Sequence, residues 1–186
     1  MEKYLSSPAA FLIKMLGGNK GNKEMKIEMN FSTQRLTART LDRTMTGIQN
    51  EIMTMFTEPV SRHLPPACQN FRTAGDVDNW LEGMAQTGSV LRITEQQQAI
   101  GYLFVFPEPE NSYRLGYVLD ETQWGKGFAT EAMQGLVTYL SEYEGAASCI
   151  AGVEPDNVGS VNVLKKLGFA YSYSEQNVDY YKLQNA

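Results

Sequence analysis

Long apolar runs are missing from the sequence, and this absence excludes several kinds of protein. A membrane-spanning helix needs roughly 18 or more apolar residues in a row, whereas the best candidate, Pro8–Leu16, is short and interrupted by Lys14. A secretory leader begins with a basic segment and ends in a small-residue cleavage site, and neither accompanies this stretch. We therefore expect a cytoplasmic protein with no membrane partner.

Cysteine and basic charge are also scarce. Cys68 and Cys149 are the only cysteines and lie far apart, so we predict reduced thiols and no metal site. The formal net charge is −5, whereas a nucleic-acid-binding protein normally carries a basic domain. Residues 1–26 hold five lysines and two acids, so the rest of the chain is distinctly acidic. That balance argues against nucleic acid as a partner and is compatible with a cationic substrate.

The 186 residues suit one domain with a sizeable core. Gly17–Asn22 is polar and without periodicity, and the short segment Ala9–Leu16 before it makes at most a marginal helix. We predict an N-terminal extension with a flexible stretch over residues 1–24, and a folded domain over residues 25–186. The extension is either a docking segment or sequence upstream of a start at Met25.

Apolar spacing then alternates between the periods of strands and helices. The predicted strands are Ile27–Phe31, Arg35–Arg39, Val90–Thr94, Ile100–Phe106, Tyr113–Leu119, Ser148–Val153, Phe169–Ser174 and Val178–Leu183. The predicted helices are a run from Asp42 to Phe56, then Thr73–Gln86, Gly127–Tyr143 and Val158–Leu167, with an extended break at Pro59, Pro65 and Pro66. We predict an α/β (α+β) fold, with a mixed, mostly antiparallel sheet of about six to seven strands and helices on both faces.

A glycine-rich turn between a strand and a helix carries the strongest functional signal. The strand ending at Leu119 runs through Trp124-Gly-Lys-Gly127 into the helix that follows. Glycines let the backbone approach a ligand closely, and the unpaired N–H groups at a helix start attract phosphate. Lys126 either adds charge there or is a solvated loop residue. The spacing does not fit a P-loop. It does not fit a dinucleotide-binding fingerprint either, because Thr130 stands where that fingerprint needs Gly or Ala.

A second element follows about 30 residues later. The strand ending at Val153 leads through Glu154 into a helix that Asn157 can cap, with Ser160 one turn inside. Each residue alone has an ordinary structural explanation, as a cap or a surface hydroxyl. Their occurrence together at this distance from the glycine turn favours a shared ligand site.

Here the chain resembles the GNAT acetyltransferases, in particular the branch that acetylates ribosomal-protein N-termini, over about residues 33–183. The resemblance rests on Thr33-Gln-Arg35-Leu36-Thr-Ala-Arg39, Trp124-Gly-Lys-Gly127-Phe-Ala129, and Asn157-x-x-Ser160 with Leu167-Gly168-Phe169. It implies an acetyl-CoA site between the strands ending at Leu119 and Val153. The implied coenzyme-binding residues are Val118, Leu119, Trp124, Gly125, Lys126, Gly127, Phe128, Ala129, Thr130, Asn157 and Ser160.

Two positions depart from the family pattern. Leu164 stands where many members carry a tyrosine acid, and the resemblance makes Ser160 its substitute as proton donor to the thiolate. Arg114 stands where relatives commonly carry a glutamate. Glu154, at a strand end, is our candidate base, with Glu175 a weaker second choice. His63 is either a substrate contact or a surface residue, and Glu131 is interpreted as structural.

The sequence therefore predicts an N-acetyltransferase that transfers acetyl from acetyl-CoA to a primary amine by direct attack, as a monomer or homodimer. The acceptor stays open among a protein N-terminus, a polyamine or amino acid, and an amine-bearing toxin or antibiotic. The alternatives are a non-catalytic acyl-CoA sensor or adaptor of the same fold, and an unrelated phosphate- or nucleotide-binding domain.

Overall fold

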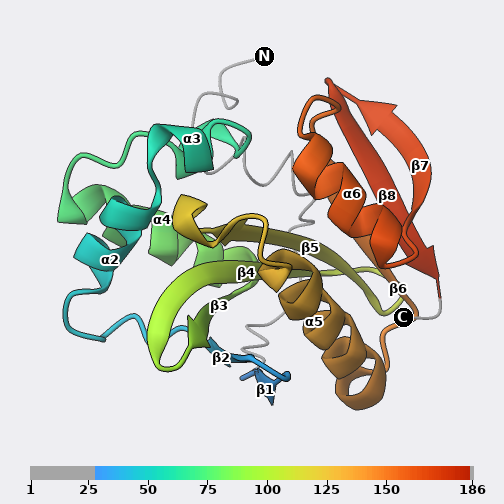
Figure 1. Ribbon diagram of the computed structural model, residues 1–186, viewed down its shortest axis with the longest axis horizontal. Coiled ribbons are helices and arrows are strands. Elements are labelled where there is room, and N and C mark those ends of the chain that lie inside the picture. Colours follow the sequence, from blue (N-terminus) through green and yellow to red (C-terminus); the bar gives the residue numbers. More distant parts are fainter. Residues whose placement is uncertain (1–27, 185–186) are drawn as a thin grey trace, which may run out of the picture.

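One mixed sheet of eight strands organises the protein. The computed structural model describes residues 28–184, so the predicted N-terminal extension lies outside the described part. The strand order is β1-β2-β3-β4-β5-β6-β8-β7, and every neighbouring pair is antiparallel except β5 and β6. The predicted α/β class with a mostly antiparallel sheet is confirmed. The strand count was too low, because both N-terminal strands and the C-terminal hairpin join the same sheet (Figure 1).

The elements follow one another along the chain much as the apolar spacing predicts. The strands are β1 Asn30–Ser32, β2 Leu36–Thr40, β3 Ser89–Glu95, β4 Gln98–Glu108, β5 Ser112–Leu119, β6 Ser148–Val153, β7 Ala170–Glu175 and β8 Val178–Gln184. The helices are α2 Ile48–Met55, α3 Glu58–Ser61, α4 Ala74–Thr87, α5 Phe128–Glu144 and α6 Val158–Lys166, with 3-10 turns η1 Pro66–Cys68 and η2 Glu121–Gln123.

Two predictions between residues 42 and 66 were wrong. Asp42 does not cap the first helix, because its carboxylate accepts hydrogen bonds from the Thr44 amide (2.8 Å) and hydroxyl (2.6 Å) and closes a local turn instead. The helix starts at Ile48, and its N-cap is Gly47, five residues later than predicted. The proline-rich break is not fully extended either, because Pro59 and Pro66 sit in the first turns of α3 and η1, where a missing N–H costs nothing.

The sheet separates two apolar cores. Alternate side chains of the strands point to opposite faces, and each face is closed by its own helices. On one face Leu115 and Leu119 pack with Phe128, Met133 and Leu136 of α5. On the other face the central strands pack against α2 and α4, with Tyr102 and Phe104 beside Trp80. Helices cover both faces, as predicted.

The strands β5 and β6 separate soon after they meet. Their parallel pairing covers only three residue pairs and ends at Arg114 and Ile150, although β5 continues to Leu119 and β6 to Val153. The far side of β5 stays paired with β4 through Leu119. Backbone groups on the near edge of β5 beyond Arg114 therefore face an opening within the sheet rather than a neighbouring strand.

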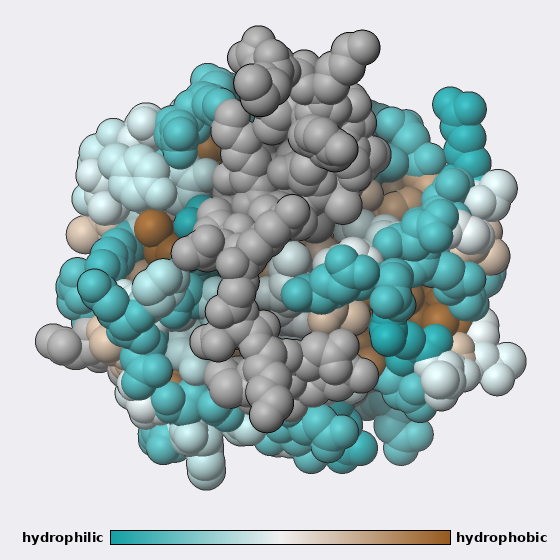
Figure 2. All heavy atoms as spheres, turned by 180° about the vertical axis from the view of Figure 1, so that it is seen from behind, coloured by the Kyte–Doolittle hydropathy of each residue, from teal (hydrophilic) through white to brown (hydrophobic). Residues whose placement is uncertain are grey.

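The coloured part of the rear face is mostly polar. In the view from behind, the coloured part shows hydrophilic residues with hydrophobic ones in small separate patches (Figure 2). Between residues 28 and 184 no helix has the length and apolar character that a bilayer crossing requires.

Candidate active site

A large cleft occupies the place where β5 and β6 separate. It has a volume of about 970 Å³ and is lined from both faces of the sheet. Its lining includes the glycine turn and the start of α5, and also the segment of residues 59–69 and the start of β8. The opening in the sheet thus connects the two faces.

The glycine turn presents backbone amides to this cleft. Gly125 and Gly127 have φ values of 74° and 81°, a left-handed conformation that other residues adopt only at a cost. Gly127 is the N-cap of α5, and the first turn of this helix is closed by the Glu131 amide, which donates to the Gly127 carbonyl over 3.1 Å. The amides of Phe128, Ala129 and Thr130 therefore have no acceptor within the helix. Together with the positive end of the helix dipole, such unpaired amides are suited to bind an anion.

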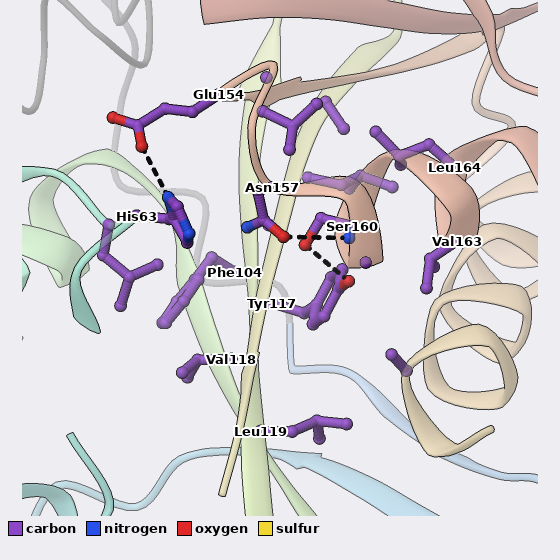
Figure 3. Close-up of a pocket in the computed structure, with 18 of the residues that line it drawn as sticks. His63, Phe104, Tyr117, Val118, Leu119, Glu154, Asn157, Ser160, Val163 and Leu164 are labelled. Atoms are coloured by element: carbon purple, nitrogen blue, oxygen red, sulfur yellow. Dashed lines mark hydrogen bonds and ion pairs between the residues drawn. The ribbon is translucent and has the colours of Figure 1, made fainter. Parts of the chain in front are cut away.

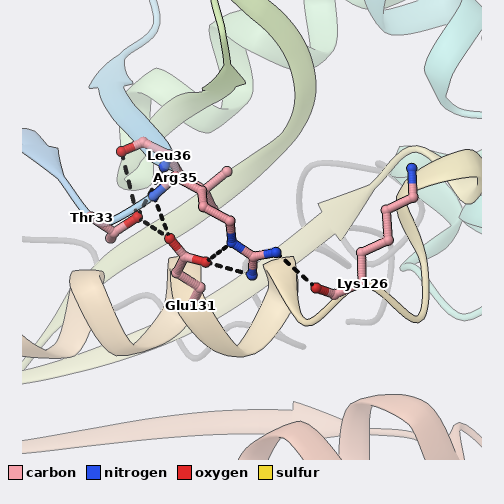
Figure 4. A network of polar contacts seen from close by, with 5 residues as sticks. All are labelled: Thr33, Arg35, Leu36, Lys126 and Glu131. Carbon is pink, nitrogen blue, oxygen red and sulfur yellow. Dashed lines mark hydrogen bonds and ion pairs between the residues drawn. The ribbon is translucent and has the colours of Figure 1, made fainter.

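A network centred on Glu131 holds the turn in place (Figure 4). Glu131 accepts hydrogen bonds from the Thr33 hydroxyl (2.6 Å) and the Arg35 amide (2.8 Å), and it pairs with the Arg35 guanidinium at 2.6 Å. The same guanidinium donates to the Lys126 carbonyl (3.1 Å) and lies 4.3 Å from the centre of the Phe128 ring. Burial alone would raise the pKa of Glu131, but these hydrogen bonds lower it below its ordinary value. The contribution to stability is present at neutral pH and is lost only as the pH falls through that lowered pKa.

Ser160 contacts a residue that sequence reasoning missed. Its hydroxyl lies 2.9 Å from the Tyr117 hydroxyl of β5, and its amide donates to the Asn157 side-chain oxygen over 3.1 Å (Figure 3). Asn157 thus caps α6 as predicted. Burial is the main reason that the pKa of Tyr117 lies above its ordinary value, so this phenol keeps its proton at neutral pH. The pair joins β5 to α6 and offers a hydroxyl proton to the cleft.

Glu154 directly follows β6 and lines the cleft in contact with His63. Its carboxylate is 2.8 Å from His63 Nδ1 (Figure 3). Arg62 Nε donates to the other ring nitrogen over 3.1 Å, so Nδ1 carries the hydrogen that Glu154 accepts. His63, Glu154 and Asp156 also place possible metal-ligand atoms within 4.8 Å of one another. The expectation that the protein has no metal site stays a prediction.

Arg114 is held by its neighbours. Its Nε donates to Glu108 over 2.8 Å, with side-chain exposures of only 12% and 14%. Its guanidinium also lies 5.4 Å from the centre of the Tyr180 ring. Arg114 is therefore neutralised inside the cleft wall.

Most predicted site residues line the one cleft. They are Val118, Leu119, Trp124, Gly125, Gly127, Phe128, Ala129, Thr130, Glu154, Asn157 and Ser160. Trp124 is 48% exposed, and its indole N–H donates to the Leu119 carbonyl over 3.0 Å. Lys126 is absent from the lining; its ammonium group donates to Gln123 over 2.9 Å. Glu175, on the exposed strand β7, does not line the cleft either. The functional roles of all these residues stay predictions.

Comparison with known proteins identifies the domain. Residues 35–170 match the family described as acetyltransferase (GNAT) domain. A curated relative, the uncharacterized N-acetyltransferase p20 of Bacillus licheniformis, is 37% identical over 91 residues, which are 48% of this chain and 51% of that protein. The chain thus spans about half the length, or less, of the curated relatives it matches.

Solved structures share the fold at low sequence identity. RimL, a ribosomal alpha-N-protein acetyltransferase in complex with coenzyme A, superposes with a TM-score of 0.70 at 18% identity, covering 84% of this chain and 98% of that one. The spermidine N-acetyltransferase of Vibrio cholerae, in complex with CoA and spermine, gives a TM-score of 0.69 at 14% identity, covering 81% and 96%. On the family match, which spans most of the described domain, the chain belongs to the GNAT family of acetyltransferase domains.

Proposed function

We propose that the protein is an acetyl-CoA-dependent N-acetyltransferase that acetylates a primary amine by direct attack in a ternary complex. The observation that carries this proposal is the shared cleft. A helix start with free amides, a free strand edge, the Ser160 hydroxyl and the Glu154 carboxylate all border one opening in the sheet. These are the groups that binding and cleaving a thioester require.

The coenzyme would lie between β5 and α6. Its pyrophosphate would accept hydrogen bonds from amides of Gly125–Thr130, at the start of α5. The amide groups of its pantetheine arm would pair with the free edge of β5 near Val118 and Leu119, as an added strand does. Asn157 and Ser160 would border the arm from the α6 side. Solved GNAT relatives bind CoA, which supports this placement.

The chemistry needs a proton to leave the amine and a proton to reach the sulfur. The neutral amine nitrogen attacks the thioester carbon, and the C–S bond breaks to release a thiolate. Glu154, backed by His63, would take the proton that the amine loses, directly or through water. Ser160 would donate a proton to the thiolate and recover one from the Tyr117 hydroxyl beside it. A proton from solvent would then restore Tyr117, and Glu154 would release the amine's proton to solvent, so that both groups return to their starting states. A backbone N–H at the end of β5 is suited to stabilise the charge on the carbonyl oxygen.

The cysteine in the cleft argues for direct attack over an acyl-enzyme. Cys68 lines the cleft, but burial raises the pKa of its thiol to about 12. The thiolate is the nucleophilic form of cysteine, so only a minute fraction of this residue is reactive at neutral pH. A covalent acetyl-cysteine intermediate is therefore disfavoured.

Incubation with labelled acetyl-CoA and a panel of amines tests the proposal. We expect free coenzyme A and an acetylated amine to appear together, in equal amounts, with at least one member of the panel. The panel should include peptides with free N-termini, since the finer assignment to the ribosomal-protein branch predicts an α-amine acceptor. Binding of acetyl-CoA without release of thiol for any amine would favour the alternative, a non-catalytic sensor. Thermal stabilisation of the protein by nucleotides but not by acetyl-CoA would contradict both the N-acetyltransferase and the acyl-CoA sensor.

Replacing Arg35 with alanine tests the support of the glycine turn. We expect the dissociation constant of acetyl-CoA to rise about fivefold, which corresponds to one hydrogen bond of about 1 kcal/mol, because Arg35 holds the Lys126 carbonyl. Calorimetry of binding measures this effect. The matched control is Arg43→Ala, which breaks an exposed ion pair of 2.7 Å with Glu82, away from the cleft. Equal affinities of the two variants would contradict the role of Arg35.

A further inference from the structure

The half of the cleft that lies away from the coenzyme turn has an apolar wall. Cross-strand partners share a face, and Phe104 pairs with Gly116 while Phe106 pairs with Arg114. The glycine leaves room for the Phe104 ring, since a Cβ there would lie 3.3 Å from it. Helices and loops on the same face complete the wall, whose apolar members are Val60, Leu64, Met84, Phe104, Phe106 and Val118.

Charges in the cleft are few and nearly balanced. Within residues 28–184, Glu154 and Asp156 are the only carboxylates that line it, and both lie beside His63 at the edge of the apolar wall. The cationic lining residues are Arg62, Arg114 and Lys166. Glu108 neutralises Arg114, so the negative charge available to a substrate is confined to one small cluster.

From this arrangement, and resting on the proposed function, we propose that the acceptor is an amine with one positive charge and an apolar body. The ammonium would meet Glu154 and Asp156, where it is attracted before it loses its proton. The body would lie on the wall around Phe104. Two sources share this chemistry: a free arylalkyl amine, and a peptide N-terminus whose first side chain is apolar.

A polyamine fits this cleft poorly. Its second and third ammonium groups would lose their hydration against a wall of aliphatic and aromatic side chains. Among the described residues, no carboxylate lines the wall there to pair with them. Removing an unpaired charge from water is costly. The cleft therefore selects against several charges as well as for an apolar group.

Steady-state kinetics on the full chain at saturating acetyl-CoA test the proposal. The amines are phenethylamine, ethylamine, spermidine, and two short peptides that begin with phenylalanine or glycine. Burial of a phenyl ring should raise kcat/KM for phenethylamine about 30-fold over ethylamine, and spermidine should fall at least about tenfold below phenethylamine. A preference for phenylalanine over glycine in the peptide arm identifies a protein N-terminus as the source, and its absence identifies a free amine.

A charge reversal at the rim sharpens the test. Arg62→Glu adds a carboxylate beside the existing cluster and should raise the ratio of kcat/KM for spermidine to that for phenethylamine about tenfold. Arg72→Glu makes the same charge change on an exposed residue outside the cleft lining and should leave the ratio unaltered. Equal kcat/KM values for ethylamine and phenethylamine, or a higher value for spermidine with the wild type, would overturn the inference about the acceptor. The proposed function would then still stand. Binding of acetyl-CoA without turnover of any amine would overturn the proposed function with it.

Discussion

Replacing Ser160 with alanine is expected to lower kcat about 100-fold or more, the scale of a lost general acid, while the affinity for acetyl-CoA stays nearly constant. The change removes the hydroxyl that lies 2.9 Å from the Tyr117 hydroxyl. The thiolate then leaves without a protein proton donor at that point. The helix should persist, because its cap uses the Ser160 amide and the Asn157 side chain, and both remain. Single-turnover kinetics and calorimetry measure the two effects separately.

Two further variants make the Ser160 result specific. Ser141→Ala removes a half-buried hydroxyl from α5, outside the cleft lining, and should leave kcat unchanged. Tyr117→Phe keeps Ser160 but removes its partner, so we expect a smaller loss of kcat than with Ser160→Ala. A Ser160→Ala enzyme with full single-turnover activity would remove this residue from the mechanism, whatever its effect on binding.

Local patterns predicted the secondary structure well where short-range chemistry decides it. Thr73 and Asp76 form a reciprocal capping box at the start of α4, and the strand predicted at Ser148–Val153 has the bounds of β6. Asp42 misled the prediction, because an Asp before an apolar helical run can equally bind its own nearby backbone. The difference of five residues between the predicted and the observed cap of α2 comes from competition between two local hydrogen-bonding schemes.

The pairings inside the cleft were beyond sequence reasoning. Tyr117 and Ser160 are 43 residues apart, and His63 and Glu154 are 91 apart. Alternation along β5 places Tyr117 on the face of Leu115 and Leu119, but nothing in the sequence says that α6 brings Ser160 opposite it. Such contacts depend on where β5 and β6 part, and that point is set by the packing of the whole sheet.

Replacing Gly127 with valine is expected to weaken acetyl-CoA binding about 10- to 100-fold, the loss of one or two hydrogen bonds to a charged group. The φ of 81° at Gly127 is strained for a β-branched residue. Relief of that strain would rotate the peptide units at the start of α5 and turn amides away from the pyrophosphate. Calorimetry measures the affinity, and thermal unfolding measures the accompanying loss of stability.

Gly47 provides the matched control, because it is also the N-cap of a helix, with a φ of 83°. Gly47→Val should lower the free energy of unfolding by about 1–2 kcal/mol, the cost of a left-handed residue, as Gly127→Val should. A Cβ at position 47 meets nothing within 4 Å, so no steric clash adds to this cost. Gly47 does not line the cleft, so its variant should bind acetyl-CoA like the wild type. If both variants lose stability and only Gly127→Val loses affinity, the ligand contact lies at the α5 turn and backbone strain alone is excluded as the cause. Equal affinities would instead place the coenzyme elsewhere in the protein.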